Sequence, residues 1–355
     1  MVILKEKVLV IFGGVSSEHD VSLVSASYVI DNIPREKYDV LKMGITKEGR
    51  CFLYGGESSK ICDGSWISDT ANLESAVISC DRSHHGIIHL GSGEIERIDV
   101  VFPVLHGKNG EDGTMQGLLE ISGIPYVGCG TAASAVCMDK ALTNAMADFK
   151  KIPQAKWTAF NKSEYEENGS ALTAEAAEYL GLPVFVKPAN AGSSVGITKA
   201  KNIDELKAAC ELAFEHDDKI VLEECVTGKE VEVAVLGNND PVASVPGEIV
   251  PCNEFYDYEA KYLAQGSKLL IPADLSDEKI KEVQQAAVRA YKALGCRGLA
   301  RVDFFVRDRD GAVMLNEPNT IPGFTSISMY PKLFNASGIP YAELLDRLIC
   351  LALEK

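Results

Sequence analysis

The chain has 355 residues, a formal net charge of −16 and 46% hydrophobic residues, which suits a protein of two or three packed units. The acidic balance argues against a nucleic-acid partner, because phosphate binding needs clustered lysine and arginine. Ten cysteines without a CxxC pair indicate neither a zinc site nor a disulfide framework, so we expect a cytoplasmic protein with reduced thiols. Residues 1–12 are too short and charged for a signal peptide, and no apolar run is long enough to suggest a membrane partner.

The first expected unit, residues 1–139, begins as a strand, a glycine turn and a helix. The apolar run 8–12 ends in two glycines and a helical pattern follows, as in the first step of a doubly wound parallel sheet. The GxGxxG fingerprint is absent, which disfavours an NAD-dependent dehydrogenase. Glu18 in the turn has two interpretations: a charge that the helix dipole favours, or a ligand for a substrate amine.

A second buried strand, residues 99–105, leads into the glycine-rich polar loop 106–113. Open α/β sheets place their ligands at such carboxyl ends of strands. His106 and Glu111 bracket the tight part of this loop, although a lone histidine there is more often structural. The loop is therefore a candidate for part of a binding site.

The second expected unit, residues 140–217, carries a pattern that suits phosphate binding. A strand at 181–187 ends in Lys187, and the small-residue loop 189–197 leads into another strand. Backbone N–H groups and serine hydroxyls of such a loop can cradle phosphates, while the lysine supplies positive charge. It is not a Walker loop, because GxxxxGK[ST] is missing, and the alternative is a plain hairpin with a surface lysine.

The third expected unit, residues 218–355, opens with two strand patterns that carry Glu223 and Glu230. These side chains could meet an adenine amine and ribose hydroxyls, or they could be exposed strand carboxylates. The segment 255–262 is rich in aromatic and charged residues, and we interpret it as a mobile lid that excludes water from a reactive intermediate. Two amphipathic helix patterns follow toward the C-terminus.

Residues 301–305 and 312–315 flank an acidic turn that contains glycine, and their β patterns predict a hairpin. The hairpin would bring Asp303 beside Glu317 and Asn319, three hard oxygen ligands without histidine or cysteine. Such a set suits Mg²⁺, which shares its ligand shell with nucleotide phosphates. The alternative is a solvated acidic hairpin, which the polar run after the second strand disfavours.

Several motifs in these patterns resemble those of the D-alanine–D-alanine ligases, which are ATP-grasp enzymes. They are residues 12–14 with Glu18, 106–113, 138–140, 187–196, 256–262, 301–303 and 316–328. The resemblance covers nearly the whole chain. It implies an α/β fold of three domains, with an N-terminal doubly wound parallel sheet and two α+β lobes that grip ATP.

The resemblance also implies roles for individual residues. The residues that would bind ATP are Lys140, Lys187, Glu223, Glu230 and Lys261. Two Mg²⁺ ions, or Mn²⁺ in their place, would be held by Asp303, Glu317 and Asn319. The residues that would bind D-alanine are Glu18, His106, Ser328 and Met329. Those implied in catalysis are Glu18, Ser193, Tyr262, Arg301 and the N–H of Gly323.

The implied reaction joins two D-alanines through a D-alanyl phosphate and supplies D-alanyl-D-alanine for peptidoglycan precursors. A non-catalytic nucleotide-binding module would lack the metal ligands or the lid, and both patterns are present. Ala191 and Ile327 depart from the glutamate and histidine that are usual in the family. Met329 is apolar and favours D-alanine as the second substrate, whereas residues 107–110 and 191–194 resemble the D-alanine–D-serine ligases of vancomycin resistance, the alternative. Similar proteins are commonly dimers, so a homodimer is expected.

Overall fold

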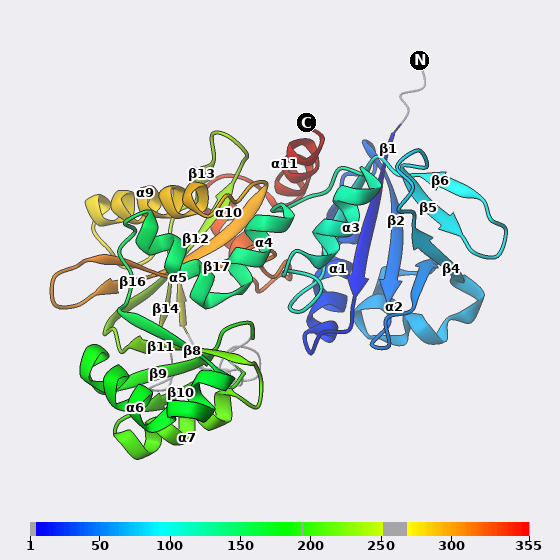
Figure 1. Ribbon diagram of the computed structural model, residues 1–355. Helices are drawn as coiled ribbons and strands as arrows, with labels where there is room; N and C mark the ends of the chain where they lie inside the picture. The colour runs from blue at the N-terminus through cyan, green and yellow to red at the C-terminus, as the bar shows by residue number, and fades with distance from the viewer. Residues whose placement is uncertain (1–4, 193–194, 251–267, 355) are drawn as a thin grey trace.

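The computed structural model describes residues 5–192, 195–250 and 268–354, and these form a mixed α/β protein with three sheets (Figure 1). The expected α/β class is confirmed. The first sheet has the strand order β6-β5-β4-β3-β2-β1-β7. Its strands are β1 (Glu6–Gly13), β2 (Tyr38–Ile45), β3 (Cys51–Tyr54), β4 (Leu73–Ile78), β5 (Gly86–His89), β6 (Ile95–Arg97) and β7 (Val100–Val104). The helices of this part are α1 (His19–Asn32), α2 (Ser58–Cys62) and α3 (Thr114–Ser122), with the short 3₁₀ helices η1 (Ser65–Ser68) and η2 (Thr70–Asn72).

Only the centre of the first sheet is parallel. β1 pairs in parallel with β2 on one side and β7 on the other, and residues 8–12 of β1 are fully buried because helices cover both faces. β3 to β6 extend the sheet as an antiparallel meander, which the sequence analysis did not foresee. The short connection from β2 to β3 permits only antiparallel pairing, since a parallel crossover needs a dozen residues or more.

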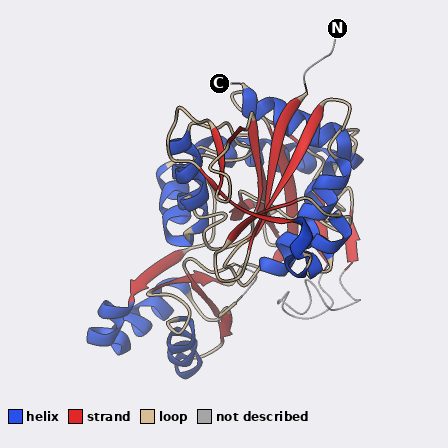
Figure 2. Ribbon diagram, turned by 90° about the vertical axis from the view of Figure 1, so that its right-hand side faces the viewer, coloured by secondary structure: helices blue, strands red, loops and turns tan. Residues whose placement is uncertain are grey.

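The second sheet forms a small lobe that extends from the rest of the molecule (Figure 2). Its antiparallel strands, in the order β10-β9-β11-β8, are β8 (Trp157–Asn161), β9 (Val184–Pro188), β10 (Thr198–Ala200) and β11 (Lys219–Glu224). The helices α6 (Lys162–Leu180) and α7 (Ile203–Ala213) pack on it and share a hydrophobic core with it. β11 belongs to this sheet although it follows residue 217, the expected end of the second unit. The three domain ranges themselves stay a prediction.

The third sheet has the order β15-β14-β12-β16-β17, with β13 paired to β12. Its strands are β12 (Gly228–Leu236), β13 (Val242–Ala243), β14 (Gly247–Val250), β15 (Lys268–Leu270), β16 (Leu299–Arg307) and β17 (Val313–Asn319). The helices of this part are α9 (Asp277–Ala293), α10 (Met329–Ala336) and α11 (Tyr341–Leu353). The helices α4 (Thr131–Met138) and α5 (Lys140–Phe149) lie between the first and second sheets in the chain and pack against β17 and α9 of the third part. Ser276 accepts a hydrogen bond from the Lys279 N–H and caps α9, whose apolar stripe packs against β12 and β16.

One hydrophobic core joins the first and third parts of the molecule. Phe12 and Phe102 of the first sheet belong to the same cluster as Phe324 and as Tyr330 and Phe334 of α10. The rings of Phe102 and Phe324 meet edge to face with centroids 6.0 Å apart. This shared core holds the carboxyl ends of β1 and β7 against the loop that precedes α10.

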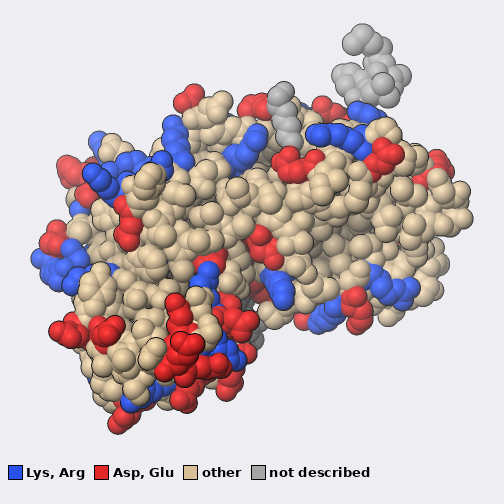
Figure 3. Space-filling model, viewed as in Figure 1, with Lys and Arg blue, Asp and Glu red and all other residues tan. Residues whose placement is uncertain are grey.

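Acidic side chains gather on the small lobe in the view of Figure 3, over α6, α7 and the second sheet. Lysine and arginine form no broad patch on the described residues of this face. Among the helices of the described ranges, none has both the length and the hydropathy to cross a membrane.

Candidate active site

A cavity of about 900 Å³ lies where the three parts of the chain meet. Its wall combines residues of α1, the loops after β7 and β9, the start of α5, the strands β12, β16 and β17, and the loop before α10. Of the residues expected in a site, those that line it are Glu18, His106, Lys140, Glu230, Arg301, Asp303, Glu317, Asn319, Gly323, Ser328 and Met329. Lys187 and Glu223 are not part of this lining.

The predicted hairpin is confirmed, and it carries the candidate metal ligands. β16 and β17 are antiparallel neighbours in which Asp303 lies opposite Glu317 and Arg301 opposite Asn319. The Nδ2 group of Asn319 donates to Oδ2 of Asp303 at 3.0 Å, and Asp303 is only 7% exposed. The alternative of a solvated acidic hairpin therefore does not hold at this carboxylate.

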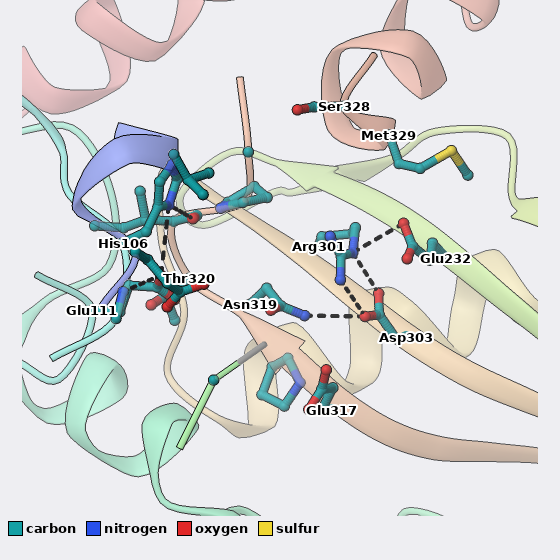
Figure 4. Close-up of a pocket in the computed structure, with 18 of the residues that line it drawn as sticks. His106, Glu111, Glu232, Arg301, Asp303, Glu317, Asn319, Thr320, Ser328 and Met329 are labelled. Atoms are coloured by element: carbon teal, nitrogen blue, oxygen red, sulfur yellow. Dashed lines mark hydrogen bonds and ion pairs between the residues drawn. The ribbon is translucent and has the colours of Figure 1, made fainter. Parts of the chain in front are cut away.

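The chemistry of this group fits a hard divalent cation. Asp303 and Glu317 present carboxylates and Asn319 presents an amide oxygen on one face of the sheet (Figure 4). Within the described parts of the chain, no three His, Cys, Asp or Glu side chains converge on a metal position. Bound phosphate oxygens would therefore have to complete any ligand shell here, as is common for Mg²⁺.

Arg301 lies between two buried carboxylates in Figure 4. Its Nε and a terminal nitrogen donate to Oδ1 and Oδ2 of Asp303 at 2.8 and 2.6 Å, and Nε is 3.1 Å from Oε2 of Glu232. Burial opposes the positive charge, but Asp303 and Glu232 outweigh it and raise the pKa of Arg301 well above its ordinary value. The guanidinium is thus permanently charged, and Arg301 forms part of the cavity wall.

Lys187 and Glu223 come together as a buried ion pair. Their Nζ and Oε2 atoms are 2.6 Å apart across β9 and β11, and the side chains are 13% and 12% exposed. Asn144 of α5 donates to the other oxygen of Glu223 at 3.1 Å. Burial opposes the charge of Lys187, but Glu223 outweighs it and raises the pKa of the ammonium group. Lys187 is therefore not a surface lysine, and Glu223 is not an exposed strand carboxylate.

The start of α5 is tied to the loop after β9. The Nζ of Lys140 donates to the carbonyl oxygen of Ala191 at 2.7 Å, and its backbone N–H donates to Ala189 at 3.0 Å. Asp139 caps α5 by accepting from the N–H of Leu142. Glu230, on β12, lines the same cavity from the third sheet.

Glu18 begins α1 and reaches the loops after β7 and β9. A Cβ atom added to Gly107 would lie 2.6 Å from its Oε2, and one added to Gly192 would lie 3.0 Å from it. Both glycines thus leave room for this carboxylate. The structure places Glu18 in the cavity wall, and its role as an amine ligand stays a prediction.

His106 is held by protein partners on both ring nitrogens. Nδ1 donates to the carbonyl of Ile321 at 3.0 Å, and Nε2 lies 3.1 Å from Oγ of Ser25. Burial lowers its basicity, but Glu111 at 3.6 Å, assisted by Glu18, outweighs burial and raises the pKa of His106. These contacts join the loop after β7 to the loop before α10, so substrate binding by His106 stays a prediction.

Comparison with known proteins adds to this geometry. Family models described as D-ala D-ala ligase N-terminus and C-terminus match residues 7–129 and 146–350. The chain therefore belongs to the D-alanine–D-alanine ligase family. A D-alanine–D-alanine ligase of Acetivibrio thermocellus is 51% identical over 363 residues, covering 99% of this chain and 96% of that protein.

Two solved structures resemble the chain over nearly its whole length. The VanG D-Ala:D-Ser ligase from Enterococcus faecalis is 45% identical with a TM-score of 0.91, covering 98% of this chain and 100% of its own. The D-alanine-D-alanine ligase from Coxiella burnetii is 34% identical with a TM-score of 0.85, covering 99% of this chain and 96% of its own. Both members of the ligase family therefore share the expected fold.

The loop before α10 forms the other end of the ligase cavity. Oγ of Ser328 accepts from the Thr325 N–H at 3.0 Å, and a Cβ atom on Gly323 would lie 2.7 Å from that oxygen. Met329 is 7% exposed and its side chain packs over Gly247. Ile327, where the family usually has histidine, is 68% exposed.

Other predicted features of the ligase family fall on residues outside the described part of the chain. They are Ser193, Lys261, Tyr262 and the expected lid segment 255–262, which falls within the undescribed range 251–267. At Ala191, where a family glutamate is missing, the main-chain oxygen is the group that Lys140 contacts. The sequence analysis missed Glu232 and Asn144, the partners of Arg301 and Glu223. The alternation of β12 could have indicated Glu232, two residues beyond Glu230 on the same face.

Proposed function

We propose that this chain is an ATP-dependent ligase that joins two D-alanines into D-alanyl-D-alanine for peptidoglycan precursors. The observation that carries the proposal is a single cavity of about 900 Å³ with a different chemistry at each end. Glu18 offers a carboxylate at one side, Lys140 a cation at another, and Asp303 and Glu317 lie beside Arg301 on the third sheet. Family membership and the 51% identity to a D-alanine–D-alanine ligase support the same activity.

ATP would lie between the second and third sheets. Lys140, Lys187 and Lys261 would hold its phosphates, while Glu223 and Glu230 would bind the adenine amine and the ribose hydroxyls. Lys187 and Glu223 lie outside the cavity lining, so this assignment requires ATP to reach their ion pair beyond the wall. The burial of that pair favours a fixed position, because separating it would leave an uncompensated charge.

Asp303, Glu317 and Asn319 would hold two Mg²⁺ ions, or Mn²⁺, whose charge offsets that of the phosphates when they are bound. Their oxygen donors fit these ions, as argued above. The carboxylate of the first D-alanine, held through its ammonium group by Glu18, would attack the γ-phosphate of ATP, so that the bond to the bridging oxygen breaks, ADP leaves and D-alanyl phosphate forms. Correct placement of the two reactants supplies most of the rate in such a step.

The neutral amine of the second D-alanine would then attack the acyl carbonyl, and negative charge would develop on its oxygen. The tetrahedral intermediate would expel inorganic phosphate, and the amine would lose a proton as the peptide bond forms. Arg301 and the N–H of Gly323 would stabilise that oxyanion, since donors fixed in a dry site need no rearrangement. Ser193 and Tyr262 would close the site against water. No covalent bond to the enzyme is required.

The second subsite is proposed to take D-alanine in preference to D-serine. Ser328 would bind the carboxylate of the acceptor, and Met329 offers an apolar surface without a hydrogen-bond partner for a hydroxyl. The likeness to the VanG D-Ala:D-Ser ligase favours D-serine as the second candidate. We further propose a cytoplasmic homodimer without nucleic-acid or membrane partners.

The test is phosphate release from ATP with D-alanine alone and with equal D-alanine and D-serine, followed by mass spectrometry of the dipeptides. We expect D-alanyl-D-alanine to be the main product of the mixture. A predominance of D-alanyl-D-serine would contradict the role given to Met329. Phosphate release that does not depend on any D-amino acid would contradict the ligase itself.

A further inference from the structure

Glu232 is a buried carboxylate to which the proposed reaction gives no role. It lies on β12 directly opposite Asp303 of β16, is 7% exposed, and lines the cavity. Opposed residues of antiparallel strands share one face, which places Glu232 beside Arg301 and Asp303 (Figure 4). A carboxylate that leaves water is costly to bury unless a partner compensates its charge.

That partner is Arg301, which donates its hydrogen bonds to Asp303 and forms an ion pair with Glu232 as well. Its fork meets both oxygens of Asp303, at 2.8 and 2.6 Å, and the same Nε lies 3.1 Å from Oε2 of Glu232. The two acids face the guanidinium from neighbouring strands, β16 and β12. Arg301 could therefore lose one of them and still keep an anionic neighbour.

The contact with Asp303 competes with the metal role proposed for that residue. Both Asp303 oxygens accept from Arg301, and Oδ2 also accepts from Asn319 at 3.0 Å. A divalent cation on these oxygens would use the same lone pairs and would repel the guanidinium at short range. Arg301 then needs another anion to stay in the cavity wall.

We propose that Glu232 is a positioning residue that retains Arg301 beside the reacting carbonyl when a divalent cation occupies the oxygens of Asp303. Glu232 acts through Arg301. It offers the guanidinium an alternative ion-pair partner, so that arginine and metal compete less for the oxygens of Asp303. The inference rests on the proposed function, because it takes the metal role of Asp303 and the oxyanion role of Arg301 from it.

The first measurement is the binding of Mn²⁺ by equilibrium dialysis, with Mn²⁺ alone and with a non-hydrolysable ATP analogue. In Glu232→Gln, Arg301 loses one of its two ion-pair partners and relies more on Asp303, so we expect Mn²⁺ to bind about ten-fold more weakly, between the worth of an exposed and of a buried ion pair. Turnover should fall with it, while the KM for D-alanine stays close to that of the wild type.

The second measurement separates positioning from a direct effect on the metal. In an Arg301→Met background the added Glu232→Gln change should alter Mn²⁺ affinity by no more than about two-fold, the scatter of independent substitutions. An equal loss of affinity in both backgrounds means that Glu232 acts on the metal directly and overturns the proposal. An unchanged affinity in folded Glu232→Gln overturns it as well.

Glu248→Gln is the matched control. Glu248 is another buried acid of the same sheet, 6% exposed on β14 and paired with Lys229 at 3.2 Å, and it does not line the cavity. This variant should keep the wild-type Mn²⁺ affinity and turnover. Should Glu232→Gln not fold, the uncharged Glu232→Met replaces it in the same cycle, where an undiminished Mn²⁺ affinity again overturns the proposal.

The wild type and an Asp303→Ala variant show whether the proposed function itself fails. A wild type that forms no dipeptide contradicts the ligase, and an Asp303→Ala variant with unchanged Mn²⁺ affinity contradicts the metal site. Both results are read without reference to Glu232. Only when wild type and Asp303→Ala behave as expected do the Glu232 variants decide the positioning role.

Discussion

Gly107→Ala should weaken the binding of the first D-alanine by disturbing Glu18. The new Cβ atom would lie 2.6 Å from Oε2 of Glu18, whereas ordinary van der Waals contact begins at 3.4 Å, so the carboxylate must retreat by most of an ångström. A charge-assisted hydrogen bond contributes about 1.5–3 kcal/mol, and losing half of the larger value corresponds to about a ten-fold weaker complex. We therefore expect a roughly ten-fold higher KM for D-alanine at the first subsite.

The same substitution also strains the backbone, and this effect needs its own control. Gly107 has φ +71°, and a left-handed conformation costs an L-residue about 1–2 kcal/mol. Gly93→Ala is matched for this strain, because Gly93 has φ +74° and nothing lies within 4 Å of its added Cβ atom. Gly107→Ala should lose at least as much free energy of unfolding as Gly93→Ala, because its Cβ atom also lies 2.5 Å from Oγ of Ser16, and only Gly107→Ala should change the kinetics.

The assay is the initial rate of ATP-dependent phosphate release over a wide range of D-alanine, fitted with two Michaelis constants. Denaturant unfolding of the two variants and the wild type gives the free energies of unfolding. If Gly107→Ala is destabilised at least as much as Gly93→Ala and yet keeps the wild-type constant for the first D-alanine, Glu18 does not bind that ammonium group.

Three further outcomes are expected. Glu317→Ala should fold but lose ATP-dependent turnover and Mn²⁺ binding by dialysis, and near-normal turnover at saturating Mg²⁺ would remove it from the metal site. Tyr262→Ala should raise the ratio of phosphate released to dipeptide formed, because water would reach the acyl phosphate; an unchanged ratio argues against a lid. Glu111, with Glu18 nearby, raises the pKa of His106 despite its burial, so the stabilisation is complete below about pH 6.5 and is lost as the pH rises through the higher folded-state pKa. Glu111→Gln should flatten this fall in the free energy of unfolding, and an identical pH profile for the variant refutes the pairing.

Local patterns in the sequence were sufficient to place several residues of the candidate site. The hairpin that pairs Asp303 with Glu317 follows from two alternating runs around a short acidic turn, and neighbouring strands joined by such a turn have few other ways to pair. The buried strand at residues 8–12 and the α1 helix after it were predictable for the same reason, because their signals lie within one segment. β3 to β6 escaped prediction because each has only three to six residues, which leaves little apolar alternation to detect.

The partners of the charged side chains were decided by the tertiary structure alone. Asn144 and Glu223 are 79 residues apart and meet only because α5 packs against the second sheet. His106 contacts the carbonyl of Ile321, 215 residues away, through the core that joins the first and third parts. Glu232 faces Arg301 because β12 lies next to β16 in the strand order. A sequence pattern specifies which face of its own strand a residue occupies, but the neighbour on that face depends on strand order and packing, which only the folded chain determines.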